Sequence, residues 1–162
     1  MIQRTLELDL PPRTSAFLWG ARQVGKTTFL RERFPGATFF DLLDTKLHLE
    51  FVTSPWLLRE RLAGDDPGNP PQPVILDEVQ KAPALLDEVH WLIENRGIQF
   101  ILCGSSARKL KRGRANLLGG RAWRFEMSPL VSAEIGEIDL LRALNHGLLP
   151  PHYLGEDPRK AL

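Results

Sequence analysis

The stretch that decides the fold is Gly20-Ala21-Arg22-Gln23-Val24-Gly25-Lys26-Thr27. It follows an apolar run, SAFLW at 15–19, that predicts a buried strand. It opens a segment from 26 to about 34 that predicts a helix, which Pro35-Gly36 ends. A glycine-bounded loop between a strand and a helix gathers backbone N–H groups at the positive end of the helix dipole. The sequence therefore predicts a phosphate-binding loop.

The residue types within the loop suit a nucleoside triphosphate with magnesium, most simply ATP with Mg²⁺. Gly20 and Gly25 allow a tight turn and a close approach to phosphate. Lys26 would reach the β- and γ-phosphates, and the Thr27 hydroxyl would bind Mg²⁺. We expect Arg22 to be solvated rather than catalytic. The predicted nucleotide-binding set is Gly20, Ala21, Arg22, Gln23, Val24, Gly25, Lys26, Thr27 and Thr28.

Two acidic residues, Asp77 and Glu78, follow the apolar run VIL at 74–76, which predicts another buried strand. In enzymes with a phosphate loop, an Asp at this place holds the magnesium shell. A second carboxylate can accept the proton of the water that attacks the γ-phosphate. Asp77 is therefore the candidate magnesium ligand and Glu78 the candidate general base, unless the strand simply ends in acidic residues.

Ser105 and Ser106 follow a third apolar run, 98–103, and Gly104. A hydroxyl here could lie between the carboxylates and the γ-phosphate, where it would orient water or sense hydrolysis. The alternative for either serine is the N-cap of a helix.

A basic stretch without any acidic residue runs from 95 to 125. It could be a solvated face, a nucleic-acid contact, or the source of an arginine for the γ-phosphate, in cis or from a neighbouring subunit. Arg121, after Gly119-Gly120, is the best candidate for that arginine. The basic residues are Arg96, Arg108, Lys109, Lys111, Arg112, Arg114, Arg121 and Arg124.

Strands and helices are predicted to alternate along the rest of the chain, which favours a parallel sheet covered by helices on both faces. Ser132 is expected to cap the last helix, with Glu134 in its first turn. The proline-rich segment 64–73 predicts an exposed loop. The predicted strands are 15–19, 37–42, 74–76, 98–103 and 122–127, and the predicted helices 26–34, 44–52, 55–63, 83–95 and 132–145.

Composition is that of a soluble globular protein: 162 residues, 43% hydrophobic and 25% charged, with a net charge of +1. A single cysteine, Cys103, excludes an internal disulfide and suits a reducing cytoplasm. The N-terminus lacks the apolar stretch of a signal peptide, and no run reaches the roughly 18 apolar residues of a membrane helix. We therefore expect a cytoplasmic protein without a membrane partner.

With these features in this order, the chain resembles a family of prokaryotic AAA-type ATPases of the additional-strand catalytic-glutamate class. Members of that family pair an N-terminal phosphate-loop domain with a C-terminal domain of unknown function. The Asp-Glu-Val-Gln-Lys and Gly-Ser-Ser-Ala segments are specific to it. The matching stretches are GARQVGKTT (20–28), FFDLLD (39–44), VILDEVQKAP (74–83), ILCGSSARKL (101–110), LLGGRAWRFEMSPL (117–130) and the following SAEI.

The resemblance implies an α/β fold of three layers, the P-loop NTPase fold, with a mainly parallel five-stranded sheet of order 5-1-4-3-2. It also implies ATP binding and hydrolysis, sensor behaviour at Ser105 or Ser106, and a recurrent Gly-Arg element that contains Arg121. The ATPase domain would span 1–146. Residues 147–162 would form a tail leading to a second domain that is missing from this sequence.

Three functions compete at this point. The leading one is an ATPase whose cycle drives a conformational or assembly change, with a homo-oligomer as a possible form. The second is a nucleotide-gated module that binds DNA or protein through the stretch Arg108–Arg124. The third is a small-molecule P-loop kinase, against which the carboxylate beside Asp77 weighs. A GTPase is disfavoured because no Asn-Lys-x-Asp segment occurs.

Overall fold

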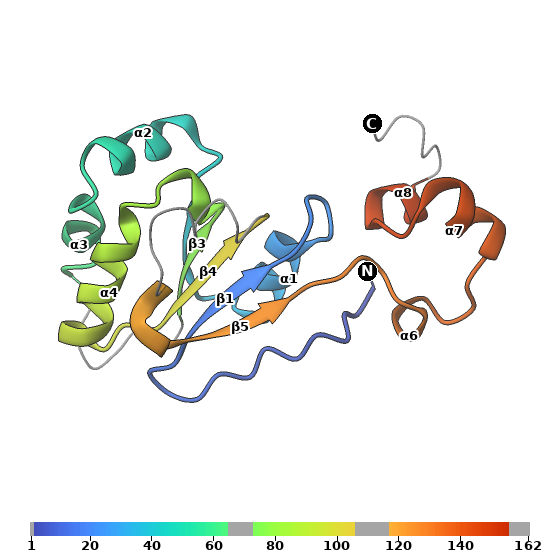
Figure 1. Ribbon diagram of the computed structural model, residues 1–162, viewed down its shortest axis with the longest axis horizontal. Coiled ribbons are helices and arrows are strands. Elements are labelled where there is room, and N and C mark those ends of the chain that lie inside the picture. The colour runs from blue at the N-terminus through green and yellow to red at the C-terminus, as the bar shows by residue number, and fades with distance from the viewer. Residues whose placement is uncertain (1, 65–72, 106–116, 156–162) are drawn as a thin grey trace.

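A computed structural model describes residues 2–64, 73–105 and 117–155, and its centre is a five-stranded sheet (Figure 1). All four strand pairings are parallel, and the strand order is β2-β3-β4-β1-β5. This confirms the predicted α/β fold and the order 5-1-4-3-2. The strands are β1 (Ser15–Trp19), β2 (Thr38–Asp41), β3 (Val74–Asp77), β4 (Phe100–Gly104) and β5 (Ala122–Glu126).

Helices lie on both faces of the sheet, as predicted, while the last three are set off to one side beyond β5 (Figure 1). The helices are α1 (Lys26–Arg33), α2 (Thr45–Thr53), α3 (Leu57–Arg61), α4 (Leu85–Arg96), α6 (Ser132–Ile135), α7 (Leu140–His146) and α8 (Pro150–Leu154). Two 3₁₀ helices, η1 (Val79–Lys81) and η2 (Leu117–Gly120), lie between them.

Two cores result from the alternation of side chains along the buried strands. In β1, Phe17 and Trp19 belong to the core under α2, α3 and α4, where their rings stack. Ala16 and Leu18 belong to the opposite core, which Leu30 of α1 completes. Because β1 is buried on both faces, it holds the phosphate loop on a rigid base.

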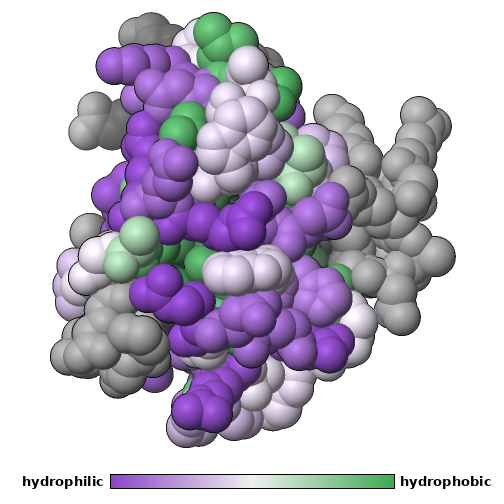
Figure 2. Space-filling view, turned by 90° about the vertical axis from the view of Figure 1, so that its left-hand side faces the viewer, coloured by the Kyte–Doolittle hydropathy of each residue, from purple (hydrophilic) through white to green (hydrophobic). Residues whose placement is uncertain are grey.

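The outer face of the α2–α4 layer is mainly hydrophilic (Figure 2). Single apolar side chains are exposed among its polar residues, including Leu49, Val52 and Trp56. The described residues contain no helix that is long and apolar enough to cross a membrane.

The last predicted helix, 132–145, is wrong as a single element. Gly136, with φ 77°, ends α6 after one turn, and Asp139 caps α7 by accepting from the Arg142 N–H at 2.9 Å. The N-cap of α6 is Val131 rather than Ser132. Glu134 does lie in the first turn, where its carboxylate accepts from the Val131 N–H at 3.2 Å.

A smaller difference concerns β4, which begins at Phe100 instead of 98. The Ile98 N–H is already bonded to the Leu92 carbonyl as the chain leaves α4. Several predictions fall outside the described residues: the body of the proline-rich loop, Ser106, and the basic residues Arg108, Lys109, Lys111, Arg112 and Arg114.

Candidate functional site

The predicted phosphate loop leaves the carboxyl end of β1 and enters α1, and glycine is required at both of its ends. A Cβ at Gly20 would lie 2.4 Å from the Met127 carbonyl oxygen, a backbone atom held by the bond from Met127 N–H to Trp19. Gly25 has φ +94°, a conformation that residues with a side chain rarely adopt. The loop therefore has its shape because neither position carries a side chain.

Lys26, the first residue of α1, is folded back into the loop. Its side chain is buried, and Nζ donates to the carbonyl oxygens of Gly20 and Ala21, each at 2.9 Å. A buried ammonium needs such partners, and phosphate oxygens would satisfy it as well. The loop thus holds a positive charge where the sequence predicts phosphates.

The side chains of Thr27 in α1 and Asp77 in β3 are in contact. The Thr27 hydroxyl donates to Asp77 Oδ2 at 2.5 Å, although 50 residues separate the two along the chain. Asp77 ends β3 and is 3% exposed. A hydroxyl and a carboxylate side by side are hard oxygen donors of the kind that bind Mg²⁺ together with substrate phosphates. Within 2–64, 73–105 and 117–155 no cluster of three or more His, Cys, Asp or Glu forms a metal site of protein ligands alone.

Cys103 of β4 is a hydrogen-bond neighbour of Asp77. Burial raises the pKa of its thiol well above the ordinary value, and the negative charge and hydrogen bond of Asp77 raise it further. The thiol therefore keeps its proton at neutral pH and serves as a small core residue rather than a nucleophile.

Glu78 and Ser105 also meet at this edge of the sheet. Ser105 Oγ donates to Glu78 Oε2 at 3.4 Å, and the Glu78 N–H donates to Asp77 Oδ1 at 2.9 Å. A third polar side chain, Gln80, donates to both Glu78 Oε2 and Ser105 Oγ. Sequence reasoning assigned no role to Gln80, although it lies in the family-specific Asp-Glu-Val-Gln-Lys segment.

A cavity of about 560 Å³ opens over the loop. Glu78 lines one side of it, and Pro150 and Pro151 of α8 line another. His152 of α8 also contacts the loop, since its Nε2 lies 3.3 Å from Gln23 Oε1. Part of the predicted tail therefore closes over the loop. The full lining is Arg22, Gln23, Gly25, Lys26, Thr27, Thr28, Leu43, Glu78, Pro150 and Pro151.

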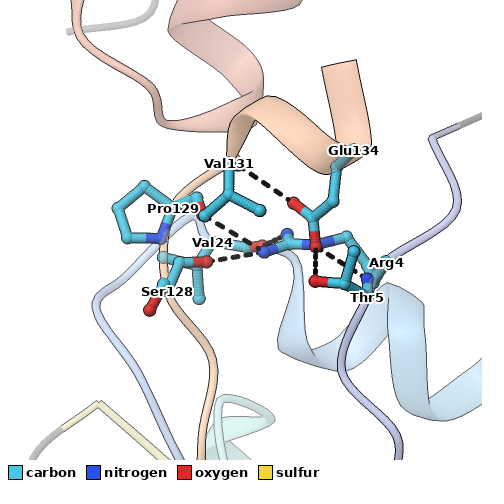
Figure 3. A network of polar contacts seen from close by, with 7 residues as sticks. All are labelled: Arg4, Thr5, Val24, Ser128, Pro129, Val131 and Glu134. Atoms are coloured by element: carbon cyan, nitrogen blue, oxygen red, sulfur yellow. Dashed lines mark hydrogen bonds and ion pairs between the residues drawn. The ribbon is translucent and has the colours of Figure 1, made fainter. Parts of the chain in front are cut away.

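An Arg4 network supports the loop from outside (Figure 3). The Arg4 guanidinium donates to the Val24 carbonyl at 2.6 Å, to the Ser128 carbonyl at 2.6 Å, and to Glu134 Oε1 at 3.0 Å. Glu134 Oε1 also accepts from the Thr5 N–H and hydroxyl. One half-buried ion pair thus joins the N-terminal segment, the phosphate loop and α6. A larger groove beside it, about 1160 Å³, contains none of the predicted site residues.

Arg121 is not brought to the loop of its own chain. Its carbonyl accepts from the Ser15 N–H at the first residue of β1, and its guanidinium pairs with Glu94 of α4. The five residues of β1 therefore separate Arg121 from the loop, a distance of about 17 Å. Assistance in cis has no support from this geometry, and assistance from a neighbouring subunit stays a prediction.

Residues 12–136 match the family model described as an AAA domain. Among solved structures, the chain is similar to the Walker-type ATPase PABY2304 of Pyrococcus abyssi, with 17% identity over 74% of this chain and 50% of that one, at a TM-score of 0.47. It is also similar to the ORC2 protein of Aeropyrum pernix, described in ADPNP–ADP complexes, with 14% identity over 82% and 46% of the two chains, at a TM-score of 0.45. The chain thus spans about half the length of these structures. The comparison with curated proteins gave no match.

Proposed function

The chain belongs to the AAA domain family, and on that basis we propose that it binds ATP with Mg²⁺ and hydrolyses it to ADP and phosphate. The observation that carries the proposal is the meeting of the phosphate loop with the acidic pair. Lys26 and Thr27 come after β1, whereas Asp77 ends β3 and Glu78 follows it, yet Thr27 and Asp77 are in direct contact.

We assign ATP binding to the phosphate loop, which includes Lys26 and Thr27, and to Asp77. The backbone N–H groups of the loop would hold the phosphates, and Lys26 would exchange its two carbonyl partners for phosphate oxygens. Thr27 and Asp77 would hold Mg²⁺, which neutralises phosphate charge when bound.

Hydrolysis is assigned to Glu78, which lines the cavity over the loop. As general base, its carboxylate would take the proton of the attacking water. Ser105, 3.4 Å from that carboxylate, would orient the water or respond to loss of the γ-phosphate. Ser106 is the alternative candidate for the same sensor role.

The cycle of binding and hydrolysis would drive a conformational or assembly change, in a homo-oligomer if one forms. The nucleotide-gated binding module remains the alternative, with DNA or protein bound through Arg108–Arg124. The kinase remains the third candidate, which requires an acceptor metabolite before phosphate is transferred. Addition of such metabolites to the assay below separates it from hydrolysis.

Two variants test the proposal. Lys26→Ala should lose ATP binding and turnover, because it removes the ammonium that is folded back onto the loop carbonyls of Gly20 and Ala21. Glu78→Gln should still bind ATP but lose turnover by about a hundredfold or more. Phosphate release and binding of a fluorescent ATP analogue are the measurements. Lys46→Ala, which removes an exposed lysine of α2, is the matched control.

Equal turnover in Glu78→Gln and the unchanged protein would show that Glu78 is not the base. Tight ATP binding without any turnover in the unchanged protein would favour the binding module.

A further inference from the structure

Gln80, in η1, lies between Glu78 and Ser105 and touches both. Its side-chain nitrogen donates to Glu78 Oε2 and, at 3.2 Å, to Ser105 Oγ. The Ser105 hydroxyl in turn donates to the same Glu78 oxygen. Two donors, one from η1 and one from the end of β4, therefore converge on a single carboxylate oxygen.

The Gln80 amide can take this orientation only. If its nitrogen and oxygen were exchanged, the amide oxygen would face the Glu78 carboxylate, acceptor against acceptor. In the orientation observed, Gln80 Oε1 is buried and has no hydrogen-bond partner among the described residues. Gly104 leaves it room, since a Cβ there would lie 2.2 Å from Oε1. The contact with Glu78 is thus kept although it leaves a buried acceptor unsatisfied, an arrangement that proteins usually avoid.

The result is a carboxylate with one oxygen engaged and one available. Glu78 Oε1 accepts no hydrogen bond from residues 2–64, 73–105 or 117–155, and Glu78 lines the cavity beside Lys26 and Thr27. The Glu78 backbone is in the left-handed region, with φ 55° and ψ 41°. A general base needs a lone pair held in a defined direction toward the proton that it accepts.

We infer that Gln80 is a positioning residue, which holds Glu78 through Oε2 so that Oε1 faces the phosphate cavity. The inference rests on the proposed function, in which Glu78 is the general base. Gln80 is not placed on the nucleotide itself, since it does not line the cavity over the loop.

The first test separates catalysis from binding. Gln80→Leu removes the donor and keeps a side chain of similar size, so kcat should fall about tenfold to a hundredfold. The KM for ATP and the affinity for a non-hydrolysable ATP analogue should stay within about twofold. In a Glu78→Gln background the same change should cause no further loss, because there is no base left to position. Gln3→Leu, at an exposed glutamine of the N-terminal segment, is the control.

The second test needs no nucleotide. Unfolding of the free protein in urea is compared for Glu78→Ala, Gln80→Leu and the double variant. Because the contact exists without ATP, the double variant should lose less stability than the sum of the two single losses. Should Gln80→Leu fold poorly, Gln80→Glu replaces it in both tests, since it substitutes an acceptor for the donor and keeps the shape.

Turnover by Gln80→Leu at the rate of the unchanged protein would overturn the inference and leave the proposed function intact. The inference would also be overturned if the losses of turnover caused by Glu78→Gln and by Gln80→Leu multiplied in the double variant. Absence of turnover in the unchanged protein would overturn the proposed function instead. In that case, additive losses in urea would show in addition that Gln80 does not hold Glu78.

Discussion

Gly20 and Gly104 are two residues of the site at which a Cβ atom has no room. At Gly20 the obstacle is the Met127 carbonyl at 2.4 Å, a backbone atom held by the hydrogen bond from Met127 N–H to Trp19. At Gly104 the obstacles are Gln80 Oε1 at 2.2 Å and the buried Trp19 ring at 2.8 Å. Both positions therefore require glycine.

Gly20→Ala should destabilise the protein by about 1–3 kcal/mol, because strand β1 and residue 127 must separate to admit the methyl group. The midpoint of urea unfolding measures the loss. Gly64→Ala is the matched control, since a Cβ at Gly64 meets no atom of the described residues within 4 Å and its φ is not positive. An equal loss in the two variants would mean that the close approach at Gly20 does not matter.

Arg4 and Glu134 together join the N-terminal segment, the phosphate loop and α6. Burial acts to raise the pKa of its carboxyl, but hydrogen bonds from Thr5, Arg4 and Val131 outweigh burial and hold the pKa below its ordinary value. The ionised form is thus preferred in the folded state. Its contribution to stability is complete above the pKa of the unfolded chain and is lost as the pH falls through the folded-state pKa.

Glu134→Gln should therefore cost about 2 kcal/mol at neutral pH and should flatten the decline of stability toward acid pH. Urea unfolding at several pH values is the measurement. Glu50→Gln is the control, because Glu50 pairs with Arg61 at a more exposed site, where loss of an ion pair costs about 1 kcal/mol or less. Parallel stability curves for Glu134→Gln and the unchanged protein would contradict the assignment.

At the scale of the whole molecule, the order of the strands decides which residues share an edge. All five strands are parallel, so everything that follows a strand lies at one edge and everything that precedes one lies at the other. Thr27, Glu78 and Ser105 follow strands and lie at the loop. Arg121 precedes β5 and lies at the opposite edge, where Glu94 pairs with it.

Nucleotide binding at the sheet edge that carries the phosphate loop should stabilise the whole domain. At a free concentration of Mg²⁺-ATP one hundred times the Kd, the expected gain is about 2.7 kcal/mol. Thermal unfolding should shift upward with ATP in the unchanged protein and in Glu78→Gln, but not in Lys26→Ala. A shift of the same size in Lys26→Ala would place the nucleotide elsewhere, for which the groove along the N-terminal segment would be the next candidate.

The sequence by itself determined the elements and the chemical types of the site. Apolar runs that end in Gly20, Asp77 and Gly104 predict the strands that carry the loop, the acidic pair and Ser105, since a buried strand must be apolar until it reaches the sheet edge. The resemblance to AAA-type ATPases added the order of those strands. The same local signals missed the break at Gly136, because glycine is tolerated within a helix pattern and its positive φ cannot be read from composition.

Only the tertiary structure decided which of these residues touch. Three contacts at the site depend on how the strands are ordered and packed. They are the contact between Thr27 and Asp77, the contact between Ser105 and Glu78, and the contact of α8 with the loop. Arg121 is the opposite case, a candidate residue that the structure does not bring to the loop of its own chain. Its residue type suits a phosphate, but the parallel sheet places it at the far edge, because its position before β5 fixes the edge at which it lies.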